Sequence, residues 1–533
     1  MTRISRAFTV PALALALAAT LALAPTTGAH AQGDPNVFNF GVYFEPSGVD
    51  PHISTDAAAT WMANNLYDTL IRYDTTTLDD GTVVGTTDFK PWLAESWTVS
   101  EDGSTFVFQI RDGVPFHDGS ILTAEDVAFS LQRVLTLNFA PAQLLRDCLT
   151  PDDISVTGPL EVTATLRTTC PFFLSLLVQT PTGAIMSRDY VMANGGVEAE
   201  TINDVIRTTP MGTGPFTWGE WDPGVVYELH AFADYWGGPP RLERINFRFI
   251  SDLASQYVLM QQGSIDAMYN PPIDILEQAL TNPALKVLDQ QTIGLQTLYM
   301  PNINPPFDDV RVRQAVQYAL DQQEIADAAT LGLAAPARSA FPSLLPGFTD
   351  AHWVYDRDIE RARALLEEAG YPDGFDTTIS YNSGNAQREI SAVVAQAQLA
   401  EVGIRAEVQA VAWPTFVEGF REGTMPMYVV SGLAAPVPDQ FVDQTFVSDS
   451  AGPGGNYAYF ADPEVDELSA QLAETVDPEA RLAIMDRIQE RLMEQLPSAY
   501  LYNAVLPYVV RAVVQDWVIY PSGDWFFNTV YKD

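Results

Sequence analysis

Basic side chains are scarce in this sequence. Its 533 residues include 28 lysines and arginines against 68 aspartates and glutamates, which gives a formal net charge of −40. A strongly negative chain repels the phosphate backbone of nucleic acids and anionic lipid surfaces. We therefore exclude nucleic acid as a partner and expect an acidic surface that keeps the protein in solution.

Cysteine and histidine are also rare, which limits the chemistry that the chain can support. There are two cysteines and five histidines, and no histidine stands beside a cysteine or four residues from another histidine. Zinc sites usually need such pairs. The sequence also lacks the G-x-S-x-G motif of hydrolases, a phosphate-binding loop and a dinucleotide-binding loop. We therefore assign no catalytic residue, no metal site and no cofactor, and we expect that the protein is not an enzyme.

The first residues are typical of a secretory signal. Arg3 and Arg6 precede an apolar run at 12–24, and the small residues of a cleavage site follow at 29–31. The run is too short for a membrane-spanning helix, which needs about 20 apolar residues. No cysteine follows the run to carry a lipid. We expect a signal peptide at 1–31 that directs a soluble protein, and not a lipoprotein, to the periplasm.

The two cysteines are expected to form a disulfide, because exported proteins fold in an oxidising compartment. Cys148 and Cys170 flank two alternating stretches, 154–156 and 161–166, which are joined by a Gly-Pro turn at 158–159. This pattern predicts a β-hairpin, and a hairpin brings its two ends together. Two buried free thiols remain the alternative.

The rest of the chain predicts helices and strands in alternation. Large apolar residues at every second position of 105–110 predict a strand with one buried face. Thr123, which acidic residues follow, is typical of a helix N-cap. A helix predicted at 387–402 leads into a strand predicted at 404–411, and such units build partly parallel sheets. We expect an α/β fold.

Short segments in a fixed order, spread over more than four hundred residues, resemble the family 5 solute-binding proteins of ABC importers. That family includes the oligopeptide-, dipeptide- and nickel-chelate-binding proteins. The segments are VDPH at 49–52, NLYDTL at 65–70, PWLAESW at 91–97, DGSTF at 102–106, GVPFHDG at 113–119, TAEDV at 123–127, GTGPF at 212–216, YWGG at 235–238, RVRQAV at 311–316 and DPEVD at 462–466.

The resemblance implies a two-lobed periplasmic binding protein fold of the cluster C type, hinged and with an extra insert domain. By that analogy lobe I comprises 33–72, 186–292 and 506–533, the insert domain comprises 73–185, and lobe II comprises 293–505. The chain then crosses between the lobes near Thr292 and Val505, which makes these positions the hinge candidates.

The same resemblance implies the function. The protein would capture a solute, most naturally a peptide or peptide-like compound, between two closing lobes and deliver it to the permease subunits of an ABC importer in the inner membrane. It would act as a monomer. Two alternatives stay open: a non-peptide cargo such as an opine, a glycoside or a chelated metal, and an envelope chaperone or sensor that uses the same fold.

Three residues of lobe II are ligand-binding candidates by resemblance. Trp413 matches the tryptophan that forms a pocket wall in the family, where it stacks on the ligand. A buried core position is the alternative for this side chain. Tyr381 lies in the stretch 379–382 where dipeptide binders carry the arginine that binds the ligand carboxylate. Arg388 is the nearest basic residue to that stretch.

The segment that binds the ligand amine in peptide binders differs here. Gly432 is followed by Leu433 where the family usually has tryptophan, and Pro436 takes the place of the amine-binding acid. We expect Asp439 to match a later, structural aspartate. In a competing placement, Asp439 anchors the amine and Arg388 the carboxylate. A buried zwitterion needs a counter-charge at both ends, so the first placement predicts weak binding of unmodified dipeptides.

Overall fold

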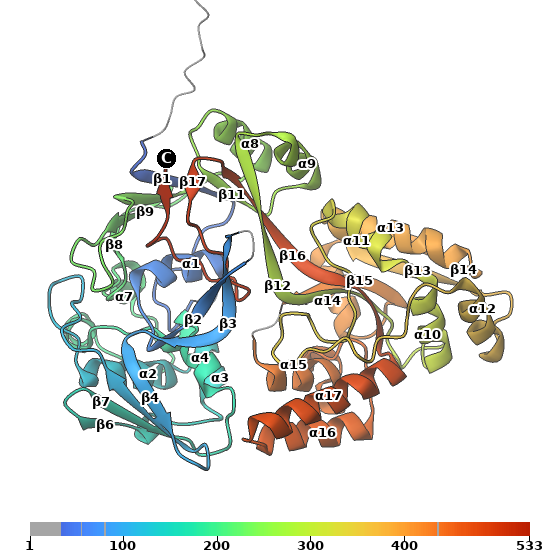
Figure 1. The fold of residues 1–533 in the computed structure, drawn as a ribbon, viewed down its shortest axis with the longest axis horizontal. Coiled ribbons are helices and arrows are strands. Elements are labelled where there is room, and N and C mark those ends of the chain that lie inside the picture. Colours follow the sequence, from blue (N-terminus) through green and yellow to red (C-terminus); the bar gives the residue numbers. More distant parts are fainter. Residues whose placement is uncertain (1–33, 55, 79–80, 434–435) are drawn as a thin grey trace, which may run out of the picture.

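The computed structural model describes residues 34–54, 56–78, 81–433 and 436–533. The signal peptide that we predict at 1–31 lies outside the described residues. Figure 1 shows two bodies joined by two long strands, β12 (Leu285–Tyr299) and β16 (Ser498–Arg511). In the described part of the chain, no helix is long and apolar enough to cross a membrane.

One mixed sheet of ten strands runs through both bodies. Its order is β14 (Ile404–Val411), β13 (Phe375–Asn382), β15 (Met427–Leu433), β12, β16, β11 (Ala267–Tyr269), β1 (Val37–Val42), β10 (Arg244–Phe249), β9 (Val226–Ala231) and β8 (Phe216–Asp222). The pairs β13–β14, β13–β15, β1–β10 and β1–β11 are parallel. The prediction of an α/β fold with a partly parallel sheet is confirmed.

We call the body built around β1 and β8–β11 lobe I. Its other elements are α1 (Ala57–Leu66), α6 (Arg188–Ala193), α7 (Asp204–Thr208), α8 (Leu253–Gln261), α9 (Ile273–Thr281), β17 (Val514–Gln515) and β18 (Tyr531–Lys532). Its core is rich in aromatic rings. The Trp61 and Trp525 rings stack with centroids 3.7 Å apart, and this contact fixes the C-terminal segment against α1.

The insert domain has a separate sheet and core, below lobe I in Figure 1. Its sheet order is β4 (Ala94–Val99), β5 (Thr105–Ile110), β7 (Glu161–Thr165) and β6 (Ile154–Gly158), with the helices α2 (Ala124–Leu137), α3 (Ala140–Leu145), α4 (Phe173–Leu177) and α5 (Thr180–Gly183). A hairpin of β2 (Ile71–Thr77) and β3 (Val83–Pro91) precedes it. The predicted strand is β5, and Thr123 caps α2 together with Asp126 in a reciprocal capping box.

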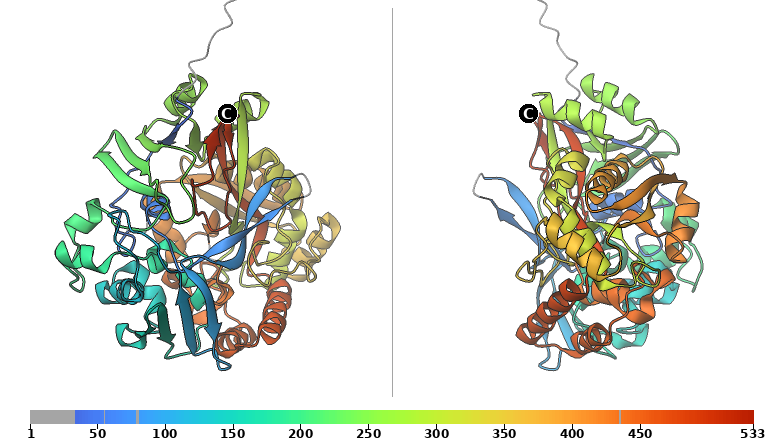
Figure 2. Two further views of the ribbon diagram at one scale, coloured as in Figure 1. Left: turned by 60° about the vertical axis from the view of Figure 1, so that its left-hand side comes forward. Right: turned by 90° about the vertical axis from the view of Figure 1, so that its right-hand side faces the viewer.

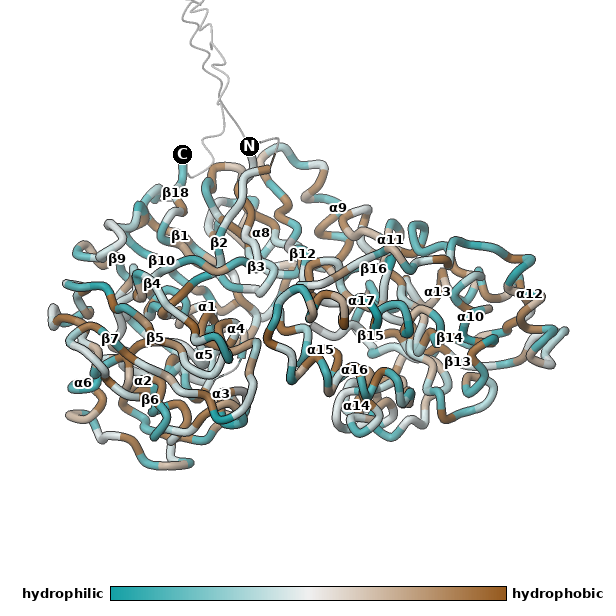
Figure 3. Tube along the Cα trace, turned by 60° about the horizontal axis from the view of Figure 1, so that its bottom comes forward, coloured by the Kyte–Doolittle hydropathy of each residue, from teal (hydrophilic) through white to brown (hydrophobic). Residues whose placement is uncertain are grey.

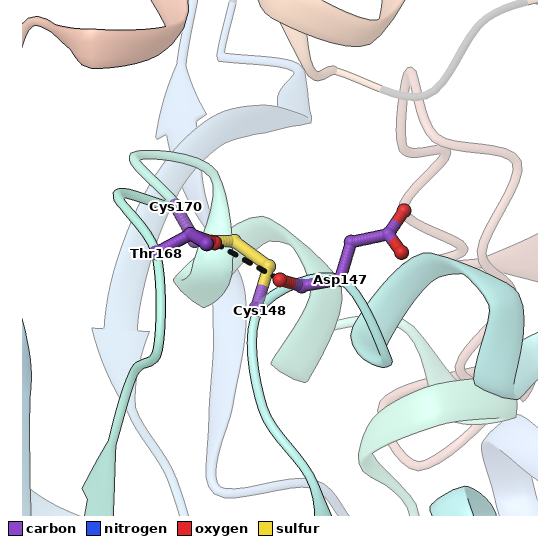
Figure 4. The surroundings of a disulfide bond; sticks show 4 residues. All are labelled: Asp147, Cys148, Thr168 and Cys170. Carbon is purple, nitrogen blue, oxygen red and sulfur yellow. Dashed lines mark hydrogen bonds between the residues drawn. A yellow bond between two sulfur atoms is a disulfide. The ribbon is translucent and has the colours of Figure 1, made fainter.

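The predicted disulfide between Cys148 and Cys170 is present (Figure 4). Strands β6 and β7 form the predicted hairpin, and the Cα atoms of the two cysteines are 5.8 Å apart. The hydroxyl of Thr168 donates a 2.9 Å hydrogen bond to the carbonyl oxygen of Asp147, which further joins the two ends. The alternative of two free thiols is wrong.

Lobe II is the body built around β13, β14 and β15. Its helices are α10 (Val310–Ala319), α11 (Gln322–Thr330), α12 (Ile359–Glu368), α13 (Ala386–Ala400), α14 (Trp413–Arg421), α15 (Pro438–Phe446), α16 (Pro463–Glu474) and α17 (Pro478–Gln495). Helix α13 and strand β14 form the predicted helix-to-strand unit. Figure 3 shows α15 on the side of lobe II that faces the insert domain.

The two crossing strands change their pairing between the lobes. In lobe I, β12 pairs with β16 from Leu285 to Gln291, and in lobe II it does so from Leu295 to Tyr299, with a register shift between these stretches. Each lobe has its own apolar core. The predicted domain limits, and the hinge at Thr292 and Val505, stay predictions.

Candidate functional site

The candidate residues of lobe II gather where three parallel strands end. Ligands of α/β proteins bind outside the carboxyl ends of such strands, because the loops and helix N-termini meet there. Strand β13 ends at Asn382, β14 ends at Val411 and β15 ends at Leu433. Helices α13 and α14 begin directly after the first two of these ends.

Trp413 is the first residue of α14, and its side chain is 51% exposed. The alternative that Trp413 lies in the core is therefore wrong. Its ring leans on Phe416, which is fully buried, with centroids 6.0 Å apart. A half-exposed indole on a buried base presents one apolar surface to a ligand.

Tyr381 is buried in the core of lobe II, one residue before the end of β13. Burial raises the pKa of its hydroxyl, and the neighbouring carboxylate of Glu389 raises it further. Tyr381 therefore stays neutral and packs in the apolar core beneath the end of β13.

Arg388 lies in the first turn of α13 and is partly buried. Its guanidinium donates hydrogen bonds to Oδ1 of Asn382 at 2.5 Å and to Oγ of Ser431 at 3.2 Å. Among the described residues, no carboxylate pairs with Arg388 in an ion pair. Burial lowers the pKa of Arg388 to about 10, so the group keeps its charge at neutral pH. Within the described part of the chain, Arg388 is therefore a cation without an anionic partner.

A second polar group, Gln296, lies near the serine that binds Arg388. Gln296 of β12 is 3% exposed and lies opposite Ser431 of β15, which binds Arg388. The Nε2 atom of Gln296 is buried and has no hydrogen-bond partner among the described residues. Residues that lie opposite in an antiparallel pair share one face of the sheet. The N-terminus of α13 adds partial positive charge at this face. The arrangement therefore suits a carboxylate.

Gly432 lines a cavity of about 400 Å³ on lobe II. The other lining residues are Leu295, Thr297, Tyr299, Ala340, Gln440, Phe441, Gln444, Thr445, Phe446, Gly455, Tyr457, Ala458, Ser498 and Tyr500. None of them is an aspartate, glutamate, lysine, arginine or histidine. Oγ of Ser498 and the hydroxyl of Tyr500 are buried and have no hydrogen-bond partner within the described part of the chain. The cavity suits an uncharged ligand group that ends in a hydrogen-bonding atom, because such an atom could pair with one of these two hydroxyls.

The end of β15 lies beside this cavity, because Gly432 is one of its lining residues. A Cβ atom added to Gly432 would meet no atom within 4 Å, so the space beside this residue is open. The backbone of Leu433 pairs with Gly294 of β12, and residues 434–435, which follow it, lie outside the described residues. Pro436 is buried where the chain turns toward α15.

Asp439 lies in the first turn of α15 and is 7% exposed. Its Oδ2 accepts a hydrogen bond from Arg481, and its Oδ1 has no partner in the residues that the structure describes. Arg481 also donates to the carbonyl oxygens of Leu472 and Thr475. The pair therefore fixes α15 to the connection between α16 and α17.

The sequence did not single out Gln296, Ser498 or Tyr500. All three lie on the crossing strands, far in sequence from the loops that they approach in space. No motif marks them, because a single polar residue in an apolar strand is equally compatible with a paired core position. In the described part of the chain, no three histidine, cysteine or acidic residues form a group that could hold a metal ion.

Comparison with known proteins identifies the family. The family model described as bacterial extracellular solute-binding proteins, family 5 middle, matches residues 88–453. The dipeptide-binding protein of Escherichia coli (strain K12) is 27% identical over 518 residues, which cover 91% of this chain and 92% of that protein. Heme-binding protein A of Haemophilus influenzae is 28% identical over 475 residues, which cover 83% of this chain and 84% of that protein.

Solved structures give the same result for the fold. HbpA2 from Haemophilus parasuis superposes with a TM-score of 0.78 at 26% identity, covering 93% of this chain and 100% of that one. The predicted periplasmic binding protein fold is therefore confirmed. This chain belongs to family 5 of the bacterial extracellular solute-binding proteins.

Proposed function

We propose that the protein captures a peptide or peptide-like solute in the periplasm, encloses it between its two lobes and delivers it to the permease of an ABC importer. In this role it acts as a monomer, without cofactor and without catalysis. The observation that carries the proposal lies at the carboxyl end of the lobe II sheet, where, among the described residues, the Arg388 guanidinium has no carboxylate partner and Nε2 of Gln296 has no hydrogen-bond acceptor. A bound carboxylate would supply the counter-charge for Arg388 and an acceptor for Gln296.

The cavity beside Gly432 supplies a second contact. It would receive an uncharged side group of the solute, with Ser498 and Tyr500 as hydrogen-bonding partners. Trp413 would cover the solute from the end of β14. Peptides fit these three features, because they combine a terminal carboxylate with side groups of varied shape.

A non-peptide solute is the second candidate. One relative is named for dipeptides and another for heme, and both of these ligands carry carboxylates. The carboxylate site at Arg388 is compatible with either class. The cavity beside Gly432, which we call the cargo cavity, would then receive an apolar or hydroxyl-bearing part of a different molecule.

The experiment is mass spectrometry of the small molecule that copurifies with the protein from a periplasmic extract. We expect a solute with at least one carboxylate. In Gly432→Phe the new ring should occupy the cavity and remove the solute, because Gly432 lines the cavity and a Cβ atom at this position meets no atom of the described residues within 4 Å. Gly432→Ser is the matched control and should keep it. A solute without any anionic group, or one that Gly432→Phe retains in full, would contradict the proposal.

A further inference from the structure

The insert domain is bound to lobe I by buried polar groups. Arg133 of α2 donates to the carboxylate of Asp50 at 2.6 Å, and both side chains are fully buried. Asp68 accepts hydrogen bonds from Trp92 and Trp236 at 2.7 and 3.0 Å. A buried charge loses its partner at a high cost in free energy. The insert domain and lobe I therefore move as one unit.

The contact between the insert domain and lobe II is of another kind. Between residues 84–185 and 293–505, the described residues share no hydrogen bond and no ion pair. Instead, the turn between β4 and β5 touches the connection between α16 and α17. A Cβ atom added to Gly103 in that turn would lie 2.8 Å from Cγ1 and 3.7 Å from Cβ of Val476. Such a contact separates without breaking any polar link.

This contact and the crossing strands lie at opposite ends of the boundary between the insert domain and lobe II. Figures 1 and 2 both place β4 near α16 and α17 at the lower end of the molecule, while β12 and β16 pass above them. Two cavities of about 530 and 540 Å³ lie between the insert domain and lobe II. Both are lined by Phe172 and Asp439, and the first shares Gln440 and Gln444 with the cargo cavity of lobe II.

Each side of the contact is fixed within its own unit. In the insert domain, Oδ1 of Asp102 accepts hydrogen bonds from Ser100 and from the backbone and hydroxyl of Ser104, which hold the turn around Gly103. In lobe II, Arg481 binds two carbonyl groups of the connection that carries Val476. Two preformed surfaces can therefore meet and part as units.

We propose that Gly103 and Val476 form a clasp that closes the solute chamber opposite the crossing strands, so that the insert domain is the second jaw of the binding protein. This inference rests on the proposed capture of a solute between the lobes. Val476 keeps 40% of its surface exposed in this contact, and Val99 and Leu482, which line the adjoining cavity, are 45% and 53% exposed. The apolar contact is therefore small, and a small apolar contact contributes little free energy that opening would have to overcome.

The test is a disulfide across the clasp in the full-length protein. The 3.7 Å between the two Cβ positions is within the range of natural disulfides, so Gly103→Cys with Val476→Cys should form a bond that mass spectrometry detects. Gly119→Cys with Val476→Cys is the matched control. Gly119 has a similar positive φ of 85° and no neighbour within 4 Å, so it carries the same strain without the contact.

Two readouts follow. Small-angle scattering of the solute-free protein should give a smaller radius of gyration for the oxidised clasp variant than for the reduced one. Protein loaded with mixed tripeptides before oxidation should lose them about tenfold more slowly after oxidation, since closure acts on the dissociation rate. Equal radii in the oxidised and reduced forms would overturn the clasp.

The two proposals can fail separately. If no tripeptide is retained but the radius responds to oxidation, the clasp stands and the peptide assignment falls. Val476→Asp provides a test that needs no glycine replacement. A charge in the apolar contact should enlarge the radius of gyration of the tripeptide-loaded protein and speed tripeptide loss. If Val476→Asp leaves both quantities unchanged, the clasp does not close the chamber.

Discussion

Arg481 and Asp439 form an ion pair in which both side chains are nearly buried, 12% and 8% exposed. Arg481 balances the charge of Asp439, which is the residue that the competing placement assigns as the anchor of a ligand amine. This relationship separates the two placements of the ligand site, because a carboxylate that already binds a guanidinium is a poor partner for a second cation.

Unmodified dipeptides should therefore bind weakly or not at all. Their ammonium group would be enclosed without a counter-charge, which reduces affinity by on the order of a thousandfold. Calorimetric titration with a panel of mixed dipeptides measures this. Submicromolar binding that disappears in Asp439→Asn would instead support Asp439 as the amine anchor.

The same variant should lower stability. Asp439→Asn leaves Arg481 as an unpaired buried charge, and the free energy of unfolding should fall by about 3 kcal/mol. Denaturant unfolding checks this. Asp443→Asn, one turn along α15 and exposed, is the matched control and should change stability little.

Arg388→Met should weaken the binding of solutes that carry a carboxylate. Loss of a partly buried charge partner typically costs about 2 kcal/mol or more, which is about 30-fold in affinity. The measurement compares a bound peptide with its C-terminal amide, and the two should bind alike in Arg388→Met. Arg361→Met, on the exposed face of α12, is the control. If the Arg388→Met variant still binds the peptide acid more tightly than its C-terminal amide, Arg388 does not form the carboxylate site.

Stability should fall in mild acid because of His52. Burial and the Arg133 guanidinium lower the pKa of His52 to about 3, so the residue is neutral in the folded protein. The unfolded chain binds the proton below about pH 6.5. The contribution of neutral His52 is therefore complete above pH 6.5 and is lost as the pH falls toward 3, by about 1.4 kcal/mol per pH unit.

The difference in stability between wild type and His52→Gln isolates this effect. It should shrink as the pH falls from 6.5 toward 3. Parallel curves for His52→Gln and wild type would show that His52 is not the source of the acid sensitivity.

Replacing Cys148 and Cys170 with serine should cost about 3 kcal/mol on the loop-entropy account. The bridge closes a loop with a sequence separation of 22 inside the insert domain. The loss should appear as an earlier unfolding transition of that domain, while affinity at the lobe II cavity persists. Two free thiols in denatured, unreduced wild-type protein would contradict the bridge.

Local patterns in the sequence predicted local structure well. The hairpin between the cysteines, the capped start of α2 and the passage from α13 to β14 each depend on neighbours in the chain. The family resemblance added the two-lobed fold. The partner of Asp439 could not be predicted, because Arg481 is 42 residues away and only the packing of α15 and α17 around α16 brings them together. The predicted carboxylate site at Arg388 likewise could not be found from the sequence, because Ser431 and Gln296 come from two other strands, β15 and β12.

The predicted hinge coincides with one marked feature of the structure. The hydroxyl of Thr292 donates a 2.7 Å hydrogen bond to the carbonyl oxygen of Ala504, between the two stretches in which β12 and β16 pair regularly. Thr292 is also one of the predicted crossing points. A break in strand pairing concentrates bending at a few residues, which is how hinged lobes move.

Small-angle scattering with and without the copurified solute tests the central claim most directly. If the two lobes close on the solute about the crossing strands, binding should reduce the radius of gyration. An unchanged radius, with binding confirmed by calorimetry in the same sample, would show instead that the solute occupies a preformed pocket in one lobe.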